Sequence, residues 1–334
     1  MWAVLITGRG RARATAAPPL YFTPLQHRTG GYQDGGLACN FAGGIARRVS
    51  RTIWPSCREP ARLLSLGTGS SPQSTEDSLP HFRNSFVDGF LFRAFNAWMT
   101  SLDNENKWRE MKSQLDDSIA SNFRRLNVPL EESGAALDDI AMMFHYRHLV
   151  VCYPRSARMA KDATVDLITA RFFFELDSIP FFNRTPLWCY GTIRCKGPAR
   201  SLLAALQQLV PESLEFATDT SRLGPIQVDK DVCPSCNRFC WPVSLRCHDA
   251  AQTIQIYIKS GRYGRWRINS FPSTIGQLVS RQHLDSPFGT ADHGRPARAP
   301  CSACDSGRFP FQGRRRRRPS PSYVERRRKR VCVR

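Results

Sequence analysis

The sequence predicts an α/β protein, and two segments near the N-terminus carry this prediction. Residues 40–53 place apolar side chains at helical spacing with arginines between them, which is typical of an amphipathic helix. Residues 63–66 form a short apolar run that Gly67-Thr68-Gly69 closes, which predicts a buried strand ending in a tight turn. A helix followed by such a strand is typical of α/β domains.

The middle of the chain predicts a helical segment over residues 80–185, after a polar linker. Apolar side chains recur at helical spacing in three stretches, which are residues 84–126, 137–149 and 157–174. The first stretch is expected to hold two helices. The second of these should bury one stripe of side chains: Trp108, Met111, Leu115 and Ile119.

Residues 186–290 have the pattern of a small, antiparallel, β-rich module that contains cysteines. Apolar and polar residues alternate as in strands over residues 189–195, 243–246, 253–259 and 265–268. Gly261–Gly264 is expected to turn one of these strands into the next, and residues 202–209 predict a short helix.

The chain is strongly basic, with a formal net charge of +20 over 334 residues. Much of this excess lies in two arginine-rich runs, Arg314–Arg318 and Arg326–Arg330. Residues 291–334 are also rich in Pro, Gly and Ser, so we expect a disordered basic tail that binds acidic surfaces such as lipid head groups or nucleic acid. Because the tail lacks interleaved aromatic residues, it predicts only a general electrostatic role or a nuclear-localisation-like signal.

Nothing in the sequence predicts a membrane span, because no window approaches the roughly 20 apolar residues required. Residues 1–6 are too short for the apolar part of a secretory signal, although the Arg-rich, acid-free start imitates a mitochondrial presequence. The expectation is a cytoplasmic protein, soluble or peripheral to a membrane, whose 12 cysteines are mostly reduced.

The sequence contains no complete hydrolase site. Acyl hydrolases need a nucleophile, a base and an oxyanion cradle, and the G-x-S-x-G nucleophile elbow is absent. Residues 67–71 contain the right residue types in the wrong order. Asp34-Gly35-Gly36 remains as a candidate motif, and by residue type alone it predicts a turn.

Several motifs in order resemble the last part of patatin-like phospholipases, particularly fungal ones. The matching stretches are Ala12–Phe22, Tyr32-Gln33-Asp34-Gly35-Gly36-Leu37, Arg51-Thr52-Ile53-Trp54-Pro55 and Leu64–Gly69. The resemblance implies a three-layer α/β/α domain that hydrolyses lipid or other acyl esters with a Ser–Asp dyad and no cofactor. By position, Asp34 matches the dyad aspartate, and Gly35 and Gly36 match the glycines that let the turn approach the serine.

The chain departs from this family in ways that bear on activity. The family's serine elbow and oxyanion loop lie upstream of the helix that Ala12–Phe22 matches. Asn40-Phe41-Ala42 also stands where the family has Asn-Asn-Pro, and Ala16 replaces a serine. Residues 1–72 are therefore expected to be only the C-terminal part of a patatin-like domain, and the chain is expected to be inactive alone.

Residues 80–295 resemble an extension that follows the patatin domain in some fungal proteins. The matching stretches are Phe172–Asp177, Gly191–Cys195 and Asp285–Gly289. This resemblance implies no role for the extension.

A structural zinc site is predicted near Cys233-Pro234-Ser235-Cys236, because a C-x-x-C turn presents two thiolates. A second C-x-x-C pair, Cys301 and Cys304, is farther away than the about 15 to 20 residues of compact zinc ribbons and lies in the predicted tail. The preferred ligands are therefore local, with two partners drawn from Cys240, Cys247, His248, Cys189 and Cys195, and Cys240 and Cys247 chosen first. The competing interpretation is reduced, partly buried thiols, while a redox centre is disfavoured because no thioredoxin-like pattern surrounds the pair.

Other candidate residues favour structural roles. Asp116-Asp117 and Asp138-Asp139 lie beside helical patterns and predict caps or solvated faces. His145 and His148 are one helical turn apart, but no metal motif accompanies them. The alternative function is accordingly a non-catalytic binding module with a structural zinc site and a basic tail for acidic surfaces.

Overall fold

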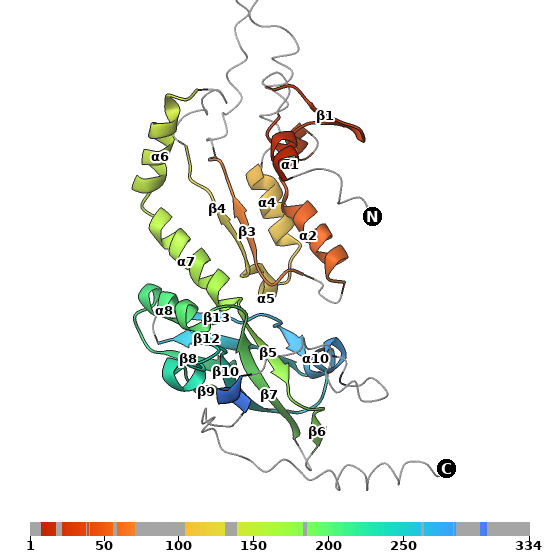
Figure 1. The fold of residues 1–334 in the computed structure, drawn as a ribbon, viewed down its shortest axis with the longest axis vertical. Coiled ribbons are helices and arrows are strands. Elements are labelled where there is room, and N and C mark those ends of the chain that lie inside the picture. The colour runs from red at the N-terminus through yellow and green to blue at the C-terminus, as the bar shows by residue number, and fades with distance from the viewer. Residues whose placement is uncertain are drawn as a thin grey trace, which may run out of the picture. The chain divides into compact units, whose positions relative to one another are not determined.

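The computed structural model describes residues 8–17, 22–37, 39, 41–55, 59–70, 104–130, 139–182, 186–261, 264–282, 284 and 301–305. The chain divides into two compact units, unit 1 (Met1–Ala163) and unit 2 (Thr164–Arg334), both drawn in Figure 1. In these described ranges, no helix has both the length and the apolar character that crossing a bilayer requires. The boundary between the units falls inside the segment 80–185, and the sequence-based domain limits stay predictions.

Unit 1 mixes helices with short strands and is α/β in class. Its described elements are α1 (Gly8–Thr15), β1 (Leu25–His27), β2 (Gly30–Tyr32), the 3₁₀ helix η1 (Gly35–Leu37), α2 (Gly43–Ile53), β3 (Leu63–Leu66), α4 (Asn104–Ser113), α5 (Asp117–Ala120), β4 (Phe123–Leu126) and α6 (Met142–Cys152). Strands β1 and β2 form an antiparallel hairpin, whereas β3 and β4 pair in parallel. The predicted helix over residues 40–53 and the predicted strand over residues 63–66 are both confirmed.

A small core holds α4 against the parallel strands. Trp108, Met111 and Leu115 are buried as the sequence predicted, and they pack with Phe41 and Phe123. Beside this core, the side chain of Arg125 on β4 donates to Glu105 of α4 over 2.5 Å and to Ser65 of β3 over 2.8 Å. Because the Arg125 side chain is only 8% exposed, its pairing with the Glu105 carboxylate satisfies a charge that would otherwise be costly to bury.

Two stretches predicted as helix are strands instead. Phe123–Leu126, inside the predicted helical stretch 84–126, forms β4, because its backbone completes a parallel ladder with β3. Phe172–Leu176 forms β5 after helix α7 (Ser156–Thr169) ends, and its burial alternates with the period of two that a strand imposes. Residues 84–103 and 137–138 lie outside the described residues.

Unit 2 is rich in antiparallel β-strands. Its elements are β5 (Phe172–Leu176), β6 (Phe181–Phe182), β7 (Leu187–Cys195), α8 (Ala199–Leu209), β8 (Leu214–Thr218), β9 (Arg222–Pro225), α9 (Val228–Asp231), β10 (Cys240–Cys247), β11 (Thr253–Ile254), β12 (Ile256–Ser260), β13 (Gly264–Arg267), β14 (Ser273–Thr274), α10 (Ile275–Arg281) and α11 (Ser302–Asp305). One antiparallel sheet has the strand order β10-β7-β5, with β6 also paired to β7. A second antiparallel sheet has the order β13-β12-β8-β9.

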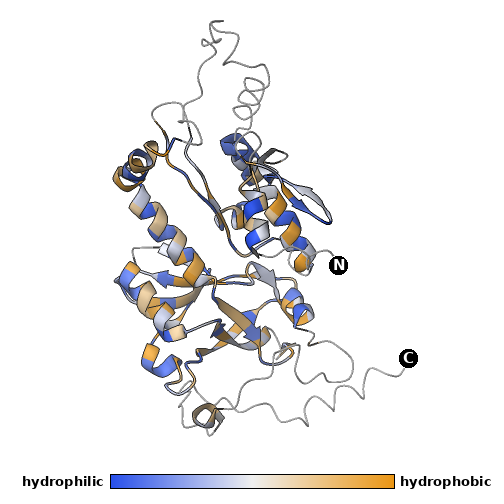
Figure 2. Ribbon diagram, turned by 45° about the horizontal axis from the view of Figure 1, so that its top comes forward, coloured by the Kyte–Doolittle hydropathy of each residue, from blue (hydrophilic) through white to orange (hydrophobic). Residues whose placement is uncertain are grey.

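The core of unit 2 draws side chains from both sheets. The ring of Phe172 on β5 meets Phe216 of β8 and Phe239, with ring centroids 6.4 and 5.2 Å apart. Helix α8 adds Leu203 and Leu206, which are fully buried. Figure 2 shows hydrophobic residues interspersed with hydrophilic ones along these helices and strands, as expected of elements with one buried face.

Truncating the central ring of this core should destabilise unit 2. Replacement Phe172→Ala removes a fully buried side chain and should lower the free energy of unfolding by about 3–5 kcal/mol. The matched control Phe182→Ala removes a ring that is 56% exposed and should cost about 0.5 kcal/mol or less. Urea unfolding of the full chain measures both, and equal losses from the two variants would contradict this core.

Candidate metal centre

Four cysteine sulfurs lie together in unit 2, brought from two C-x-x-C pairs that are far apart in sequence. Cys233 and Cys236 occupy the turn between α9 and β10, whereas Cys301 directly precedes α11 and Cys304 lies within it. All four Sγ atoms lie within 4.8 Å of one another. The Sγ–Sγ distances are 4.0 Å for Cys233–Cys301 and 3.5 Å for Cys236–Cys304, and each contact joins residues 68 positions apart.

The first pair is presented by a tight backbone knuckle. The amide of Asn237 donates to the carbonyl of Cys233, and the amide of Cys233 donates to the carbonyl of Arg238, both over 2.9 Å. Asn237 has a φ of 57°, a left-handed conformation that asparagine tolerates better than most residues. The turn therefore folds back on itself and directs both thiols of the C-x-x-C pair to one side.

The surroundings of the cluster favour one thiolate and oppose several. Burial works against ionisation of Cys233, but the backbone N–H groups of Cys236 and Ser235 donate to its sulfur and lower the pKa of Cys233 to about 6. Burial raises the pKa of Cys304, and the neighbouring thiols of Cys233 and Cys236 raise it further. Full ionisation of the cluster therefore requires a cation to offset the repulsion between the sulfurs.

A zinc ion fits the geometry of the four sulfurs. Tetrahedral Zn²⁺ with Zn–S bonds of about 2.3 Å places its ligands about 3.8 Å apart. This value falls within the separations of the cluster, from 3.5 Å to the 4.8 Å limit. Cys233 and Cys301 are buried and the other two sulfurs belong to half-buried residues, so the set is closed, as structural zinc sites are.

The structure assembles a different ligand set from the one that the sequence favoured. Cys233 and Cys236 are in the cluster, but Cys240 and Cys247 are not members of it. The sulfur of Cys240 lies 3.9 Å from Nη1 of Arg194, and Cys247 contacts the thiol of Cys189, which raises the pKa of Cys189.

The second C-x-x-C pair, which the sequence analysis set aside, supplies the other two sulfurs of the cluster. The sequence analysis assigned this pair to the basic tail, residues 291–334, because of its distance from Cys233 and the composition around it. In the structure, Cys301 and the helix α11 that follows it carry two of the four clustered sulfurs. The expectation of a disordered tail does not hold for these residues.

The aspartate of the patatin-like motif lies in unit 1, in a turn that follows β2. Its amide donates to the carbonyl of Ala17 over 3.1 Å, and its Oδ1 accepts from the amide of Gly36 over 2.9 Å. Gly35 and Gly36 form the start of η1. The half-buried Asp34 carboxylate thus caps its own turn, as the residue types alone predicted.

The remaining sequence candidates lie on the surface or cap helices. His145 and His148 are exposed on α6, where the ring of His148 approaches the sulfur of Cys152 at 3.5 Å. Oδ1 of Asp139 accepts from the amide of Ala141 just before α6, whereas Asp138 lies outside the described residues. Asp116 precedes α5 without a side-chain cap bond.

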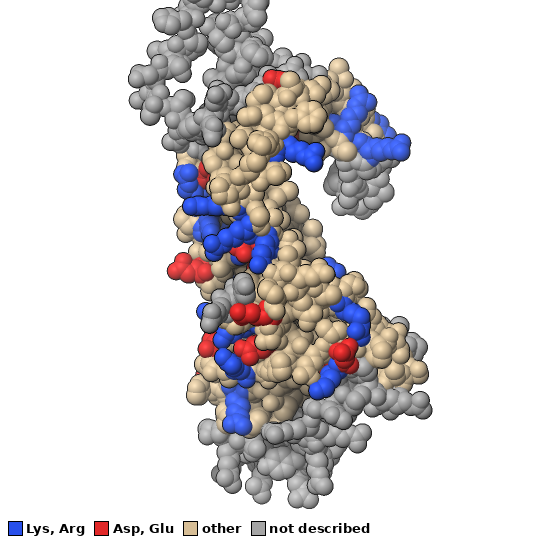
Figure 3. Space-filling view, turned by 90° about the vertical axis from the view of Figure 1, so that its left-hand side faces the viewer, with Lys and Arg blue, Asp and Glu red and all other residues tan. Residues whose placement is uncertain are grey.

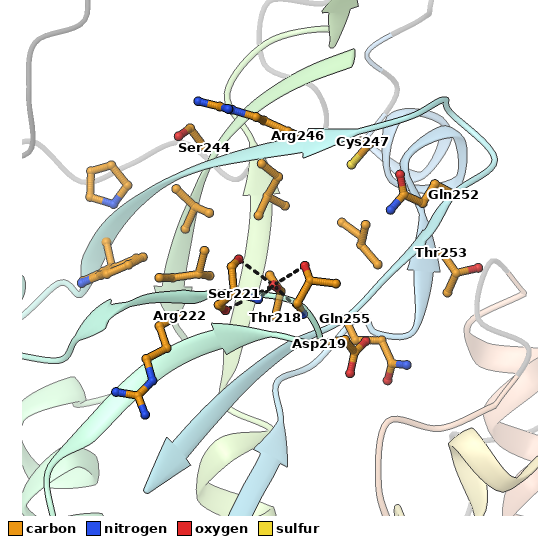
Figure 4. Close-up of a pocket in the computed structure, with 17 residues that line it drawn as sticks. Thr218, Asp219, Ser221, Arg222, Ser244, Arg246, Cys247, Gln252, Thr253 and Gln255 are labelled. Atoms are coloured by element: carbon orange, nitrogen blue, oxygen red, sulfur yellow. Dashed lines mark hydrogen bonds between the residues drawn. The ribbon is translucent and has the colours of Figure 1, made fainter. Parts of the chain in front are cut away.

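A groove of about 570 Å³ opens in unit 2 between the β8–β9 turn, β10 and β11 (Figure 4). The Thr218 hydroxyl accepts from the amide of Ser221 over 3.0 Å and lies 2.9 Å from the Ser221 hydroxyl. This hydroxyl is therefore hydrogen-bonded within its own turn. Asp219 pairs with Arg265 over 3.2 Å, and the residues that line the groove include no histidine.

Comparison with known proteins assigns no family to this chain. No protein-family model, no curated protein and no solved structure matches it.

We predict that the purified chain binds one Zn²⁺ through the two C-x-x-C pairs. Cobalt substitution should give the visible spectrum of a tetrahedral tetrathiolate, and Cys301→Ser should weaken metal binding by more than about tenfold. Affinity should also fall as the pH falls, because the metal displaces thiol protons. The matched control Cys240→Ser should leave metal binding unchanged. Weaker binding by Cys240→Ser, with unchanged binding by Cys301→Ser, would instead support the local ligand set that the sequence favoured.

Proposed function

We propose that this chain is a non-catalytic binding module stabilised by structural zinc, with a basic tail for acidic surfaces. The observation that supports it is the closed group of four sulfurs from Cys233, Cys236, Cys301 and Cys304. Four protein ligands would fill the tetrahedral shell of zinc and leave no open coordination position for a substrate. This favours a structural over a catalytic metal.

Zinc at this site would fix the segment that leads into the basic tail. The arginine run 314–318 begins shortly after α11 in sequence, so a metal bound by Cys301 and Cys304 would attach the base of the tail to unit 2. Bringing the two C-x-x-C pairs together closes a loop, because each sulfur contact joins residues 68 positions apart. Loop closure costs conformational entropy, which metal–thiolate bonds can offset. The tail would then reach its partner from a fixed origin.

We also propose that residues 1–72 are related to the last part of a patatin-like phospholipase domain. The motifs around Asp34 and the strand β3 with its following Gly67-Thr68-Gly69 support this relation. Lipid or acyl-ester hydrolysis belongs to the family, whereas this sequence has no G-x-S-x-G. The three-layer arrangement of that family stays part of the proposal.

The chain is expected to lack esterase activity. A Ser–Asp dyad needs its serine, so Asp34→Asn should leave the background rate with a chromogenic acyl ester unchanged. Turnover by the purified chain that a serine-directed fluorophosphonate abolishes would contradict the non-catalytic proposal.

The tail is expected to account for binding to a polyanion. Deleting residues 313–334 removes 11 basic residues and one acidic residue, half of the formal net charge of +20. The salt concentration that elutes the protein from a sulfated-polysaccharide column should fall markedly, since exposed charges are screened by salt. A triple control, with Arg200, Arg222 and Arg265 each replaced by Gln, should change elution far less; an equal effect would disprove the tail's role.

A further inference from the structure

Strand β10 lies at one edge of the first sheet in unit 2. That sheet has the order β10-β7-β5, and within the described residues β10 forms a ladder with β7 alone. Its eight residues make β10 longer than the mean strand of about five to six. A long edge strand presents a row of backbone donors and acceptors to which another strand can pair.

The register of the sheet shows which backbone groups of β10 point away from β7. The amide of Asp177, just after β5, donates to the carbonyl of Tyr190 over 2.9 Å, so the backbone of Tyr190 on β7 faces the β5 side. Neighbouring residues of a strand face opposite sides, so Cys189 faces β10, where Leu245 is its register partner. The amide and carbonyl of Leu245 therefore pair with β7, and those of its two neighbours in β10 point away.

These neighbours are Ser244 and Arg246, and Pro242 continues the same alternation. Proline has no N–H to donate, which suits a position that faces away from β7. All three residues are exposed, and no group of the described residues accepts a hydrogen bond from the amides of Ser244 and Arg246. The outer side of β10 thus offers donors and acceptors at the spacing of a strand.

The other edges of the two sheets are covered or short. On β5, the carbonyl of Phe172 accepts from the amide of Asn269, and the amide of Leu176 donates to the side chain of Gln282. Strands β9 and β13, the edges of the second sheet, have four residues each, and β9 ends in Pro225. Such devices limit pairing at an edge, and β10 is the longest of these four strands.

The groove of about 570 Å³ runs along β10 (Figure 4). The consecutive residues Trp241–Cys247 form one wall, which is roughly 20 Å long at about 3.4 Å per residue. Apolar side chains in the lining come from Leu223, Val243, Leu245 and Ile254. The groove is therefore long enough for an extended peptide and can accept apolar side chains from one face of it.

Charge does not select the occupant of this groove. The guanidinium of Arg246 lies over the ring of Trp188 at 4.5 Å, and that of Arg222 lies 3.5 Å from the carboxylate of Glu215. Asp219 is held in an ion pair as well. Figure 3 likewise shows acidic residues beside basic ones on the face it draws. Recognition at β10 must therefore depend on the backbone and on apolar contact.

We propose that β10 binds an extended peptide of a partner protein, which adds a strand to the first sheet. Main-chain hydrogen bonds to Ser244 and Arg246 supply affinity, and alternate side chains of the peptide enter the groove. Because successive side chains of a strand point to opposite faces, the favoured peptide alternates apolar and polar residues. This site is separate from the four sulfurs and from the basic tail, so it goes beyond the proposed function.

Selection from a phage-displayed library of random peptides tests this site on the full chain, in high salt that suppresses binding through the tail. Enriched peptides should alternate apolar and polar residues. Their affinity for Ser244→Pro should be about tenfold or more lower, because the proline removes an outward donor and places its ring at the edge. The matched variant Ser244→Ala keeps the amide and should bind as the parent chain does.

Methylating alternate amide nitrogens of an enriched peptide should abolish its binding to the parent chain, and this test holds even where Ser244→Pro does not fold. Bound peptide should also slow hydrogen exchange at the amides of Ser244 and Arg246. A library that yields no such peptide, or peptides that bind Ser244→Pro or bind after methylation as well as before, would overturn the proposal. So would a dimer of the parent chain that Ser244→Pro dissociates, because a second copy would then occupy the edge.

Discussion

The part of unit 2 around α11 depends on one electrostatic constraint, the close approach of four cysteine sulfurs. Thiolates within 4.8 Å of one another repel, and burial of Cys233 and Cys301 denies them water as a solvent for their charge. Backbone N–H groups lower the pKa of Cys233, whereas burial, and after it the neighbouring thiols, raise the pKa of Cys304. A divalent cation removes the conflict, since it turns mutual repulsion into four attractive bonds.

The apolar contacts around α11 are too few to hold this helix in place by themselves. The helix has four residues, and helices this short are not stable by themselves. The apolar contacts at this place comprise the four cysteines and Ala303, whereas the main core of unit 2 gathers Phe172, Phe216, Phe239 and many aliphatic side chains. Metal–thiolate bonds are therefore the interaction that would position α11 on the module.

Local patterns predicted much of the fold. Helical spacing gave α2 and α8, an apolar run closed by glycines gave β3, and alternation with a Gly-rich turn gave the β12–β13 hairpin. The predictions that failed concerned residues whose structure depends on neighbours that are distant in sequence. Phe123–Leu126 becomes a strand because β3 lies beside it, and Cys301 becomes a site residue because the knuckle at Cys233 lies beside it. Neither neighbour can be inferred from the few residues that flank these positions in sequence.

X-ray absorption at the zinc edge of the purified chain tests the central claim most directly. The account predicts four sulfur ligands at about 2.3 Å and no nitrogen or oxygen ligand. Loss of two of these sulfurs in the double variant Cys301→Ser, Cys304→Ser would follow. A mixed shell with histidine nitrogen in the parent chain, or a purified chain without metal that takes up none when zinc is supplied, would contradict it.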